Sequence, residues 1–387
     1  MKKIYLLGII ASAALAMTSC SSDETTEVGG AQNNAIEFGT YLGRDAQVRG
    51  IETTTANLDN MGVYASYTVG ENNAAATWAD DTSKPNFMYN QLVEKSGSAW
   101  TYSPLKYWPT TKNHSISFFA YAPQTAKSNS VITTNSENTA TGAPTLTVTL
   151  PTTDLKKMVD FVAGVQMNKK HSNDASVGNT VKFNLKHELT RLAIKAKVSE
   201  DVWKTDGTQN KTMVVITDIQ LDPVAEGQFY SSGVYKFATN DSEVGTWTGA
   251  AATTALDLST LYTKTNYTVG TGYNENGFIL ENSTAKNLFD ADHYLFLIPA
   301  NGATGLTNGK ATVTVTYDIV TTDGNLAGGC SVSHAVKTVA IPAGTLKQGT
   351  AYTLTITINV DQVKLDAVVN SWDTDDSSVN VPYDANN

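Results

Sequence analysis

The stretch AIEFGTYLGRDAQVRGI, residues 35–51, combines a short alternating apolar run with a polar connector. Ile36, Phe38 and Leu42 are spaced so that their side chains fall on one face of a β-strand, as a half-buried strand requires. We interpret this strand as removable. After a protease cut behind it, the strand would leave, and the groove would accept a strand from another subunit. The alternative is an ordinary first strand followed by a solvated loop.

A polar connector follows the strand and holds Arg44 and Arg49, two of the three arginines in the chain. The third, Arg191, lies inside a predicted buried strand that a protease would not reach. An arginine-specific cut would therefore remove the strand and connector (35–49) and leave the remaining chain intact. We favour a cut after Arg49, because this position leaves more open connector on both sides.

The N-terminus has the pattern of a secretory signal: Lys2 and Lys3, then an apolar run over residues 4–17. The run is shorter than the roughly 20 apolar residues that a membrane-spanning helix needs. Cys20 at its end indicates a lipoprotein signal peptide, residues 1–20, with Cys20 as the lipidated residue. The alternative is an ordinary signal with a cysteine nearby by chance.

Residues 21–34 are polar and acidic and are typical of a flexible tether. The Ser-Ser-Asp-Glu start of this stretch resembles the export signal of surface lipoproteins in bacteria with an outer membrane. By this resemblance, a lipid on Cys20 would anchor the protein in the outer membrane while the folded part stands away from the surface. Cys330 is the second of two cysteines in the chain, so a disulfide framework is not expected.

The composition predicts an all-β fold. Of 387 residues 41% are hydrophobic and 17% charged, and threonine, valine, tyrosine and glycine recur in short alternating runs. The length and strand spacing fit two β-sandwich domains, residues 35–180 and 181–387. A net charge of −10 argues against nucleic acid as a partner. Strands are expected at 61–67, 115–122, 145–150, 161–167, 181–198, 213–221, 293–298, 311–319, 332–341 and 352–360.

Residues for catalysis or cofactor binding do not form a known pattern. The five histidines are scattered without metal-ligand spacing, and no nucleophile elbow or phosphate loop occurs. His187 is expected to be a structural, hydrogen-bonded residue. Asp373, Asp375 and Asp376 could hold calcium, but a solvated acidic turn fits them better, because the glycine and glutamate of a calcium loop are missing. We therefore predict a protein that is not an enzyme, with no cofactor and no metal.

A cluster of aromatic residues suggests an alternative function. In a monomeric surface lipoprotein, exposed rings could stack on sugars and bind glycans, although such rings often pack in β-sandwich cores instead. The residues are Trp78, Trp100, Tyr102, Tyr107 and Trp108.

Seven segments, taken in order along the chain, resemble the fimbrillin family, the pilins of surface fimbriae in anaerobic bacteria. Each segment is moderately specific, and their order after a lipoprotein signal is more so. They are SPLKYWP (103–109), ISFFAYAP (116–123), DFVAG (160–164), FNLKHELTRLAIK (183–195), YLFLIPA (294–300), AGTLKQGTAYTLTITI (343–358) and VNSWDTDD (369–376).

The resemblance implies two transthyretin-like β-sandwich domains in tandem and export as a lipoprotein. It also implies removal of the first strand at the cell surface by an arginine-directed protease. Subunits of the family are expected to polymerise by strand exchange, in which a C-terminal strand of one fills the groove of the next. The partners would be other pilin subunits, with anchor and tip subunits among them, and the role would be adhesion.

Two C-terminal segments alternate in the way a donor strand needs. Val363 and Leu365 begin the first, and Val379, Val381 and Tyr383 form the second. The alternative is that one of them is the chain's own last strand in the sheet. We favour residues 377–383 as the donor, because Pro382 lacks an amide proton and suits a terminal position.

Overall fold

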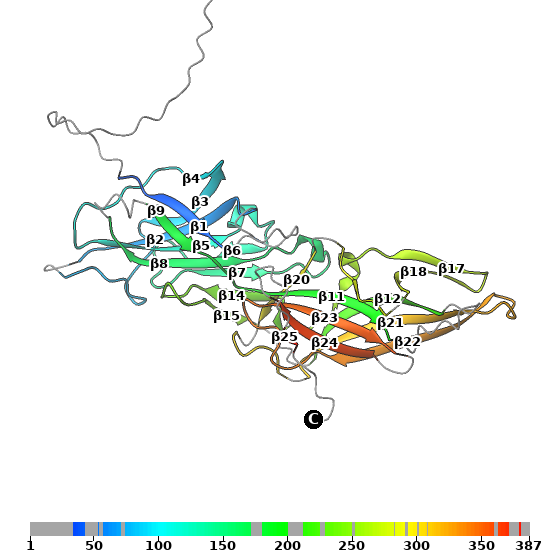
Figure 1. Ribbon diagram of the computed structural model, residues 1–387. Helices are drawn as coiled ribbons and strands as arrows, with labels where there is room; N and C mark the ends of the chain where they lie inside the picture. The colour runs from blue at the N-terminus through cyan, green and yellow to red at the C-terminus, as the bar shows by residue number, and fades with distance from the viewer. Residues whose placement is uncertain are drawn as a thin grey trace, which may run out of the picture. The chain divides into compact units, whose positions relative to one another are not determined.

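A computed structural model shows an all-β chain (Figure 1), so the predicted fold class is confirmed. Besides its strands, the described part contains three single-turn 3-10 helices, Thr125–Lys127, Leu155–Lys157 and Leu258–Leu261. Cys20, Arg44 and Arg49 lie outside the residues that the structure describes. These are residues 34–42, 53, 57–70, 74–171, 180–199, 212–224, 229–249, 252–281, 283–290, 293–299, 302–307, 309–359, 363–370 and 379–380.

Strand β5 (Ser115–Ala122) lies inside a six-stranded sheet, the β5 sheet, and every one of its residues is buried. A strand of this kind needs cover on both faces. The order of the sheet is β10 (Lys186–His187), β8 (Val162–Lys169), β5, β2 (Asn60–Thr68), β3 (Met88–Ser96) and β4 (Ala99–Thr101).

A four-stranded sheet, the β7 sheet, covers one face of the β5 sheet. Phe119 of β5 packs edge to face on Phe237, with ring centroids 5.7 Å apart, and Tyr121 contacts the same ring. The order of the β7 sheet is β15 (Thr246–Gly249), β14 (Ser232–Lys236), β7 (Thr145–Thr149) and β6 (Ile132–Thr134). Segments almost a hundred residues apart therefore build this cover.

A pair of parallel strands, the β1–β9 pair, covers the opposite face. Strand β1 (Glu37–Tyr41) runs beside β9 (Thr180–Asn184), and Figure 1 shows these two strands, blue and green, side by side. Their buried side chains join those of β5 that point away from the β7 sheet. The β5 sheet is thus the middle of three layers, between the β7 sheet and the β1–β9 pair.

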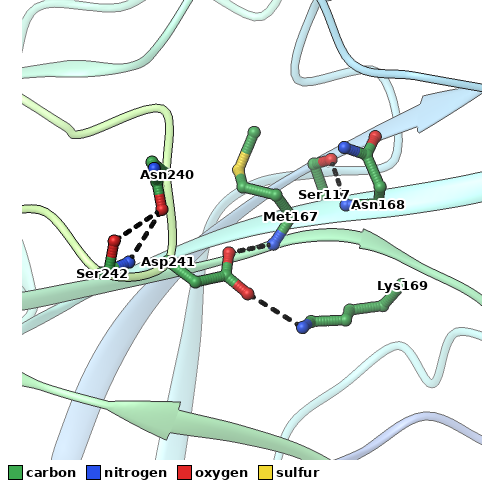
Figure 2. A network of polar contacts seen from close by, with 7 residues as sticks. All are labelled: Ser117, Met167, Asn168, Lys169, Asn240, Asp241 and Ser242. Carbon is green, nitrogen blue, oxygen red and sulfur yellow. Dashed lines mark hydrogen bonds and ion pairs between the residues drawn. The ribbon is translucent and has the colours of Figure 1, made fainter.

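The loop between β14 and β15 is fastened to the end of β8 by polar contacts (Figure 2). The Asp241 carboxylate accepts a hydrogen bond from the Met167 amide at 2.7 Å and pairs with the Lys169 ammonium at 2.9 Å. Nearby, the Asn168 amide donates to the Ser117 hydroxyl at 2.9 Å. The two Asp241 contacts join the β7 sheet to the β5 sheet, whereas the Asn168 contact lies within the β5 sheet. Strands β14 and β15 follow residue 181 in the sequence but form one sheet with β7, which precedes it. The sheets therefore do not separate at residue 180, and the domain division there remains a prediction.

Two larger sheets hold most of the remaining chain, and side chains from both enter one hydrophobic core. In the first, the β23 sheet, β11 runs parallel to β23 over eight pairs and β24 is antiparallel to β23. The strand expected at residues 181–198 is divided, because β9, β10 and β11 are separate strands with different partners. The first sheet contains β13 (Phe229–Tyr230), β20 (Leu295–Pro299), β11 (Thr190–Val198), β23 (Ala351–Ile358), β24 (Val363–Asn370) and β25 (Val379–Asn380), with β19 (Lys286–Asn287) beside β11. The second contains β17 (Thr265–Val269), β18 (Tyr273–Leu280), β12 (Thr212–Pro223), β21 (Ala311–Thr322) and β22 (Cys330–Ala340), with β16 (Leu256–Asp257) beside β12.

Candidate functional site: the seat of the first strand

The apolar side chains of the first strand are buried in a hydrophobic cluster. Ile36, Phe38 and Leu42 are 1%, 5% and 6% exposed. The predicted alternation is therefore correct, and the strand buries one face as a period of two requires. Tyr41, on the other side of the strand, is exposed.

Phe38 is the centre of this contact, because three aromatic rings surround it. The ring of Tyr102 lies 5.2 Å from it, and the rings of Phe118 and Phe183 each lie 5.9 Å from it, centroid to centroid. Edge-on and offset contacts of this type add to the gain from burial. We refer to these three residues, together with the backbone of β9, as the β1 seat.

The backbone of β1 has a hydrogen-bonded ladder on one side. Five residue pairs, from Glu37 opposite Thr180 to Tyr41 opposite Asn184, join it to β9. Before the strand begins, Ile36 donates to the Lys106 carbonyl at 2.9 Å, and the Tyr102 hydroxyl donates to the Ile36 carbonyl at 2.9 Å. No second strand of the described chain pairs with β1 itself. The attachment of β1 to the rest of the protein therefore depends mainly on one ladder and on buried side chains.

The chain is anchored again immediately after the connector. The Thr53 amide donates to Oδ2 of Asp160 at 2.9 Å, and the Thr53 hydroxyl donates to the Asp160 carbonyl at 3.2 Å. His187 Nδ1 contacts the same carboxylate oxygen at 2.8 Å. Asp160 is 1% exposed. The structural role expected of His187 agrees with this contact, whereas the sequence did not predict the anchor at Thr53.

Glu188, next to His187, lies on the side of the β7 sheet. Its carboxylate accepts a hydrogen bond from the Gln348 side chain at 2.5 Å, and its carbonyl accepts one from the indole of Trp247 at 2.8 Å. Burial raises the pKa of the Glu188 carboxyl to about 8 from an ordinary value of 4.5. This carboxyl is therefore largely protonated at neutral pH, and it belongs to the core.

The C-terminal donor candidates occupy two different settings. Leu365 is 4% exposed in the core, and Val363, the first residue of β24, packs partly buried against it; β24 pairs with β23 over its whole length. Val379 begins the short strand β25, which pairs with β24 at two positions. Val381 and Tyr383 lie outside the described residues. In this structure the first segment is the chain's own strand, an option that the sequence left open.

The five aromatic residues considered for glycan binding do not form an exposed sugar-binding face. Trp78 and Trp108 are buried, and Trp100 and Tyr102 pack partly buried against the core around β1. Tyr107 is 58% exposed. The rings of this cluster therefore hold the fold together, and the glycan alternative loses the observation on which it was based.

Within the described ranges, no group of three or more histidine, cysteine, aspartate and glutamate side chains is placed to bind a metal ion. The three aspartates considered for calcium, Asp373, Asp375 and Asp376, lie outside those ranges. Cys330 is buried and forms no disulfide. The described chain also contains no helix that is long and apolar enough to span a membrane.

The described chain is thus a set of stacked β-sheets whose first strand rests in an aromatic seat. Comparison with known proteins gives its family. A family profile described as fimbrillin-like matches residues 48–372. A relative named fimbrium subunit Fim1C, from Phocaeicola vulgatus, is 33% identical over 390 residues, with 96% of this chain and 98% of the relative covered.

A crystal structure of a fimbrial protein from Bacteroides vulgatus is similar in fold, with a TM-score of 0.71 and 30% identity. The match covers 87% of this chain and 99% of that one. The chain belongs to the fimbrillin-like family. It is a subunit of a fimbrium, a surface appendage of the cell, and because the family and the relative are structural fimbrial subunits, the prediction that it is not an enzyme is confirmed.

Proposed function

We propose that this subunit is exported as a lipoprotein through Cys20, loses its first strand by proteolysis after an arginine, and polymerises by strand exchange. Arg49 is the preferred site and Arg44 the second. The observation that carries the proposal is the way β1 is held: by one ladder and a set of buried side chains, directly before a connector with both arginines.

The energetics favour replacement of the strand over an empty groove. Ile36, Phe38 and Leu42 each contribute about 1.5–3 kcal/mol by burial, and their loss would expose the β1 seat and the open edge of β9. An incoming strand with alternating apolar residues would restore both the apolar burial in the β1 seat and the hydrogen-bonded ladder with β9. Val379, Val381 and Tyr383 have this alternation.

The remaining fold has the support to survive the loss. Phe119 and Tyr121 of β5 pack on the β7 sheet and not on β1, and Asp160 holds the chain at Thr53, beyond both arginines. A released β1 would therefore leave the two other layers of the sandwich in place.

A head-to-tail contact of this type does not close on itself, so it produces a filament. The proposed partners are other copies of the subunit, together with anchor and tip subunits of the same fimbrium. An arginine-directed protease and the lipid anchor in the outer membrane complete the proposed maturation. The filament would serve adhesion.

The test is proteolysis of the protein without its signal peptide. After treatment with an arginine-specific protease, the new N-terminus is sequenced and the particle size is followed by light scattering. We expect a cut after Arg49 or Arg44, followed by SDS-resistant ladders. The Arg44→Ala/Arg49→Ala double variant should abolish both the cut and the ladders. The two single variants show which arginine precedes the cut. A cut protein that stays monomeric would contradict strand exchange.

A further inference from the structure

A short loop holds the chain at the start of β1, on the side that faces away from β9. Ile36 donates its amide proton to the Lys106 carbonyl at 2.9 Å, and the Tyr102 hydroxyl donates to the Ile36 carbonyl at 2.9 Å. The same hydroxyl accepts the Lys106 amide at 3.3 Å, and Ala35 forms an antiparallel bridge with Tyr107. We refer to Tyr102 and the backbone of Lys106 and Tyr107 as the 102–107 clamp.

The clamp and β9 divide the backbone groups of the strand between them. The Tyr41 carbonyl accepts the Leu185 amide at 2.9 Å, so the backbone groups of Tyr41 and of every second residue before it face β9. In an extended chain the amide and carbonyl groups of successive residues point to alternate sides. Those of Ile36 and of every second residue after it therefore face the other way, and Ile36 is the residue that meets the clamp.

Tyr102 contacts two positions of the strand at once. Its hydroxyl binds the Ile36 carbonyl, and its ring lies 5.2 Å from the ring of Phe38, centroid to centroid. A strand shifted by one residue would turn its polar face to the seat. A strand shifted by two residues would keep its apolar face inward but would bring a different side chain to the Tyr102 ring. Burial raises the pKa of the Tyr102 hydroxyl, so this group keeps its proton for donation.

We propose that the 102–107 clamp sets the register of the strand in the β1 seat and selects which strands can replace β1. This inference rests on the proposed strand exchange, because it describes the incoming strand for the same seat. The clamped residue of that strand needs an amide proton, which excludes proline. Two residues further on, the strand needs a large apolar side chain for the Tyr102 ring, and the residues that face β9 need their amide protons for the ladder.

This requirement assigns a register to the C-terminal segment favoured as donor, in which Pro382 stands between Val381 and Tyr383. With Val379 at the clamp, the proline would come three residues later, inside the ladder with β9, and would remove a hydrogen bond. With Val381 at the clamp, the proline takes the first position of the strand, where proline is tolerated. Tyr383 is then the residue for the Tyr102 ring.

The first test uses the uncut, signal-less protein and needs no proteolysis. Tyr102→Phe keeps the ring and removes the hydroxyl. Amides of β1 should then exchange with solvent about tenfold faster, because a hydrogen bond that holds the strand is lost. Tyr64→Phe is the matched control, since it removes a hydroxyl that bonds to Thr134 on the side of the β7 sheet, and it should leave exchange in β1 unchanged. Unchanged exchange in Tyr102→Phe would overturn the inference.

The second test measures selection by the seat. Protein freed of its first strand by arginine-specific proteolysis is titrated with a fluorescent peptide of residues 35–42. N-methylation at Ile36 or at Gly39 removes an amide proton that meets the clamp or β9, and each should weaken binding about tenfold. N-methylation at Thr40, whose amide faces away from β9 where no described strand pairs with β1, should leave binding unchanged. Equal losses at all three positions would overturn the inference.

The same samples separate this inference from the proposed function. The expected pattern of N-methylation in protein that never assembles would support the clamp and contradict strand exchange. Assembly at the wild-type rate in Tyr102→Phe would contradict the clamp and leave strand exchange supported. In protein that assembles, Tyr383→Ala should reduce assembly more than Val379→Ala, and the reverse order would contradict the register. If the protease does not release the first strand, amide exchange in uncut Tyr102→Phe still decides.

Discussion

The two faces of the β5 sheet are buried equally well but by different covers. Phe118 and Phe119 are adjacent in β5 and both are 0% exposed. Phe119 meets Phe237 beside a sheet of four hydrogen-bonded strands, whereas Phe118 meets Phe38 on a strand with a single ladder. Under the proposed strand exchange, equal burial does not mean equal permanence. We call the face toward the β7 sheet the permanent face, and the face that holds β1, the strand proposed to be exchanged, the exchangeable face.

Phe119→Ala should have the largest effect, because it leaves a cavity on the permanent face. Truncation of a fully buried phenylalanine costs about 3–5 kcal/mol. We expect a loss of this size in the free energy of unfolding, measured by urea denaturation of the uncut protein. A loss below about 1 kcal/mol would mean that the β7 sheet covers β5 loosely, and the comparison between the two faces would fail.

Glu188 should make the permanent side sensitive to pH. Its pKa of about 8 in the folded state is above its ordinary 4.5, so its contribution to stability is complete below pH 4.5 and is lost as the pH rises through 8. Each unit by which the pKa is raised corresponds to about 1.4 kcal/mol. Glu188→Gln should remove this dependence and be more stable than the wild type above pH 8, as thermal denaturation at a series of pH values would show. Equal pH dependence in both proteins would contradict a buried, protonated Glu188.

Phe38→Ala should weaken the exchangeable face without weakening the domain to the same extent. The loss of the Phe38 ring lowers the free energy for release of β1 by about 1.5–3 kcal/mol. Hydrogen exchange at the amides of β1 should quicken accordingly, while amides of β5 keep more of their protection than in Phe119→Ala. Tyr41→Ala is the matched control, since Tyr41 is on the same strand but is 53% exposed. This variant should change hydrogen exchange neither in β1 nor in β5. Equal acceleration in β1 and β5 would show that β1 is an inseparable part of the domain.

Lys236→Ala should have the smallest effect. Its ammonium pairs with Asp80 at 2.8 Å at the surface of the β7 sheet, and both side chains are almost half exposed. Exposed pairs contribute about 0.2–1 kcal/mol and less at high salt. The variant should lose no more than this in urea denaturation, and the loss should shrink with added salt. A loss of several kcal/mol would show that this edge depends on charge more than on buried rings.

The sequence predicted strands that are either buried throughout or alternate clearly. The expected strand at residues 115–122 coincides with β5, and the alternation of Ile36 and Phe38 located β1. Strands β3, β15, β17 and β18 were missed, since exposed polar residues interrupt their patterns. Strand β14 was missed although its burial alternates, since a glycine occupies one of its two buried positions. Alternation reports burial of one face, so a mostly exposed strand leaves little trace of it.

The partners of each strand could not be predicted in the same way. Strand β9 is separated from β1 by 143 residues and pairs with it in parallel, and no local pattern specifies such a partner. The bond between Thr53 and Asp160 was missed for a related reason, because its donor is a backbone amide that every residue except proline has. The combination of a buried aspartate in DFVAG with the histidine of FNLKHELTRLAIK is the signal that could have indicated an anchor.

A peptide competition shows whether the β1 seat accepts one strand in place of another. Protein cut after Arg49 is separated from its first strand and mixed with excess synthetic peptide of residues 35–42, and particle size is followed by light scattering. We expect the peptide to refill the seat and stop assembly, while a peptide with Ile36 and Phe38 replaced by serine does not. Assembly that proceeds equally with both peptides would show that the subunits join through a different surface.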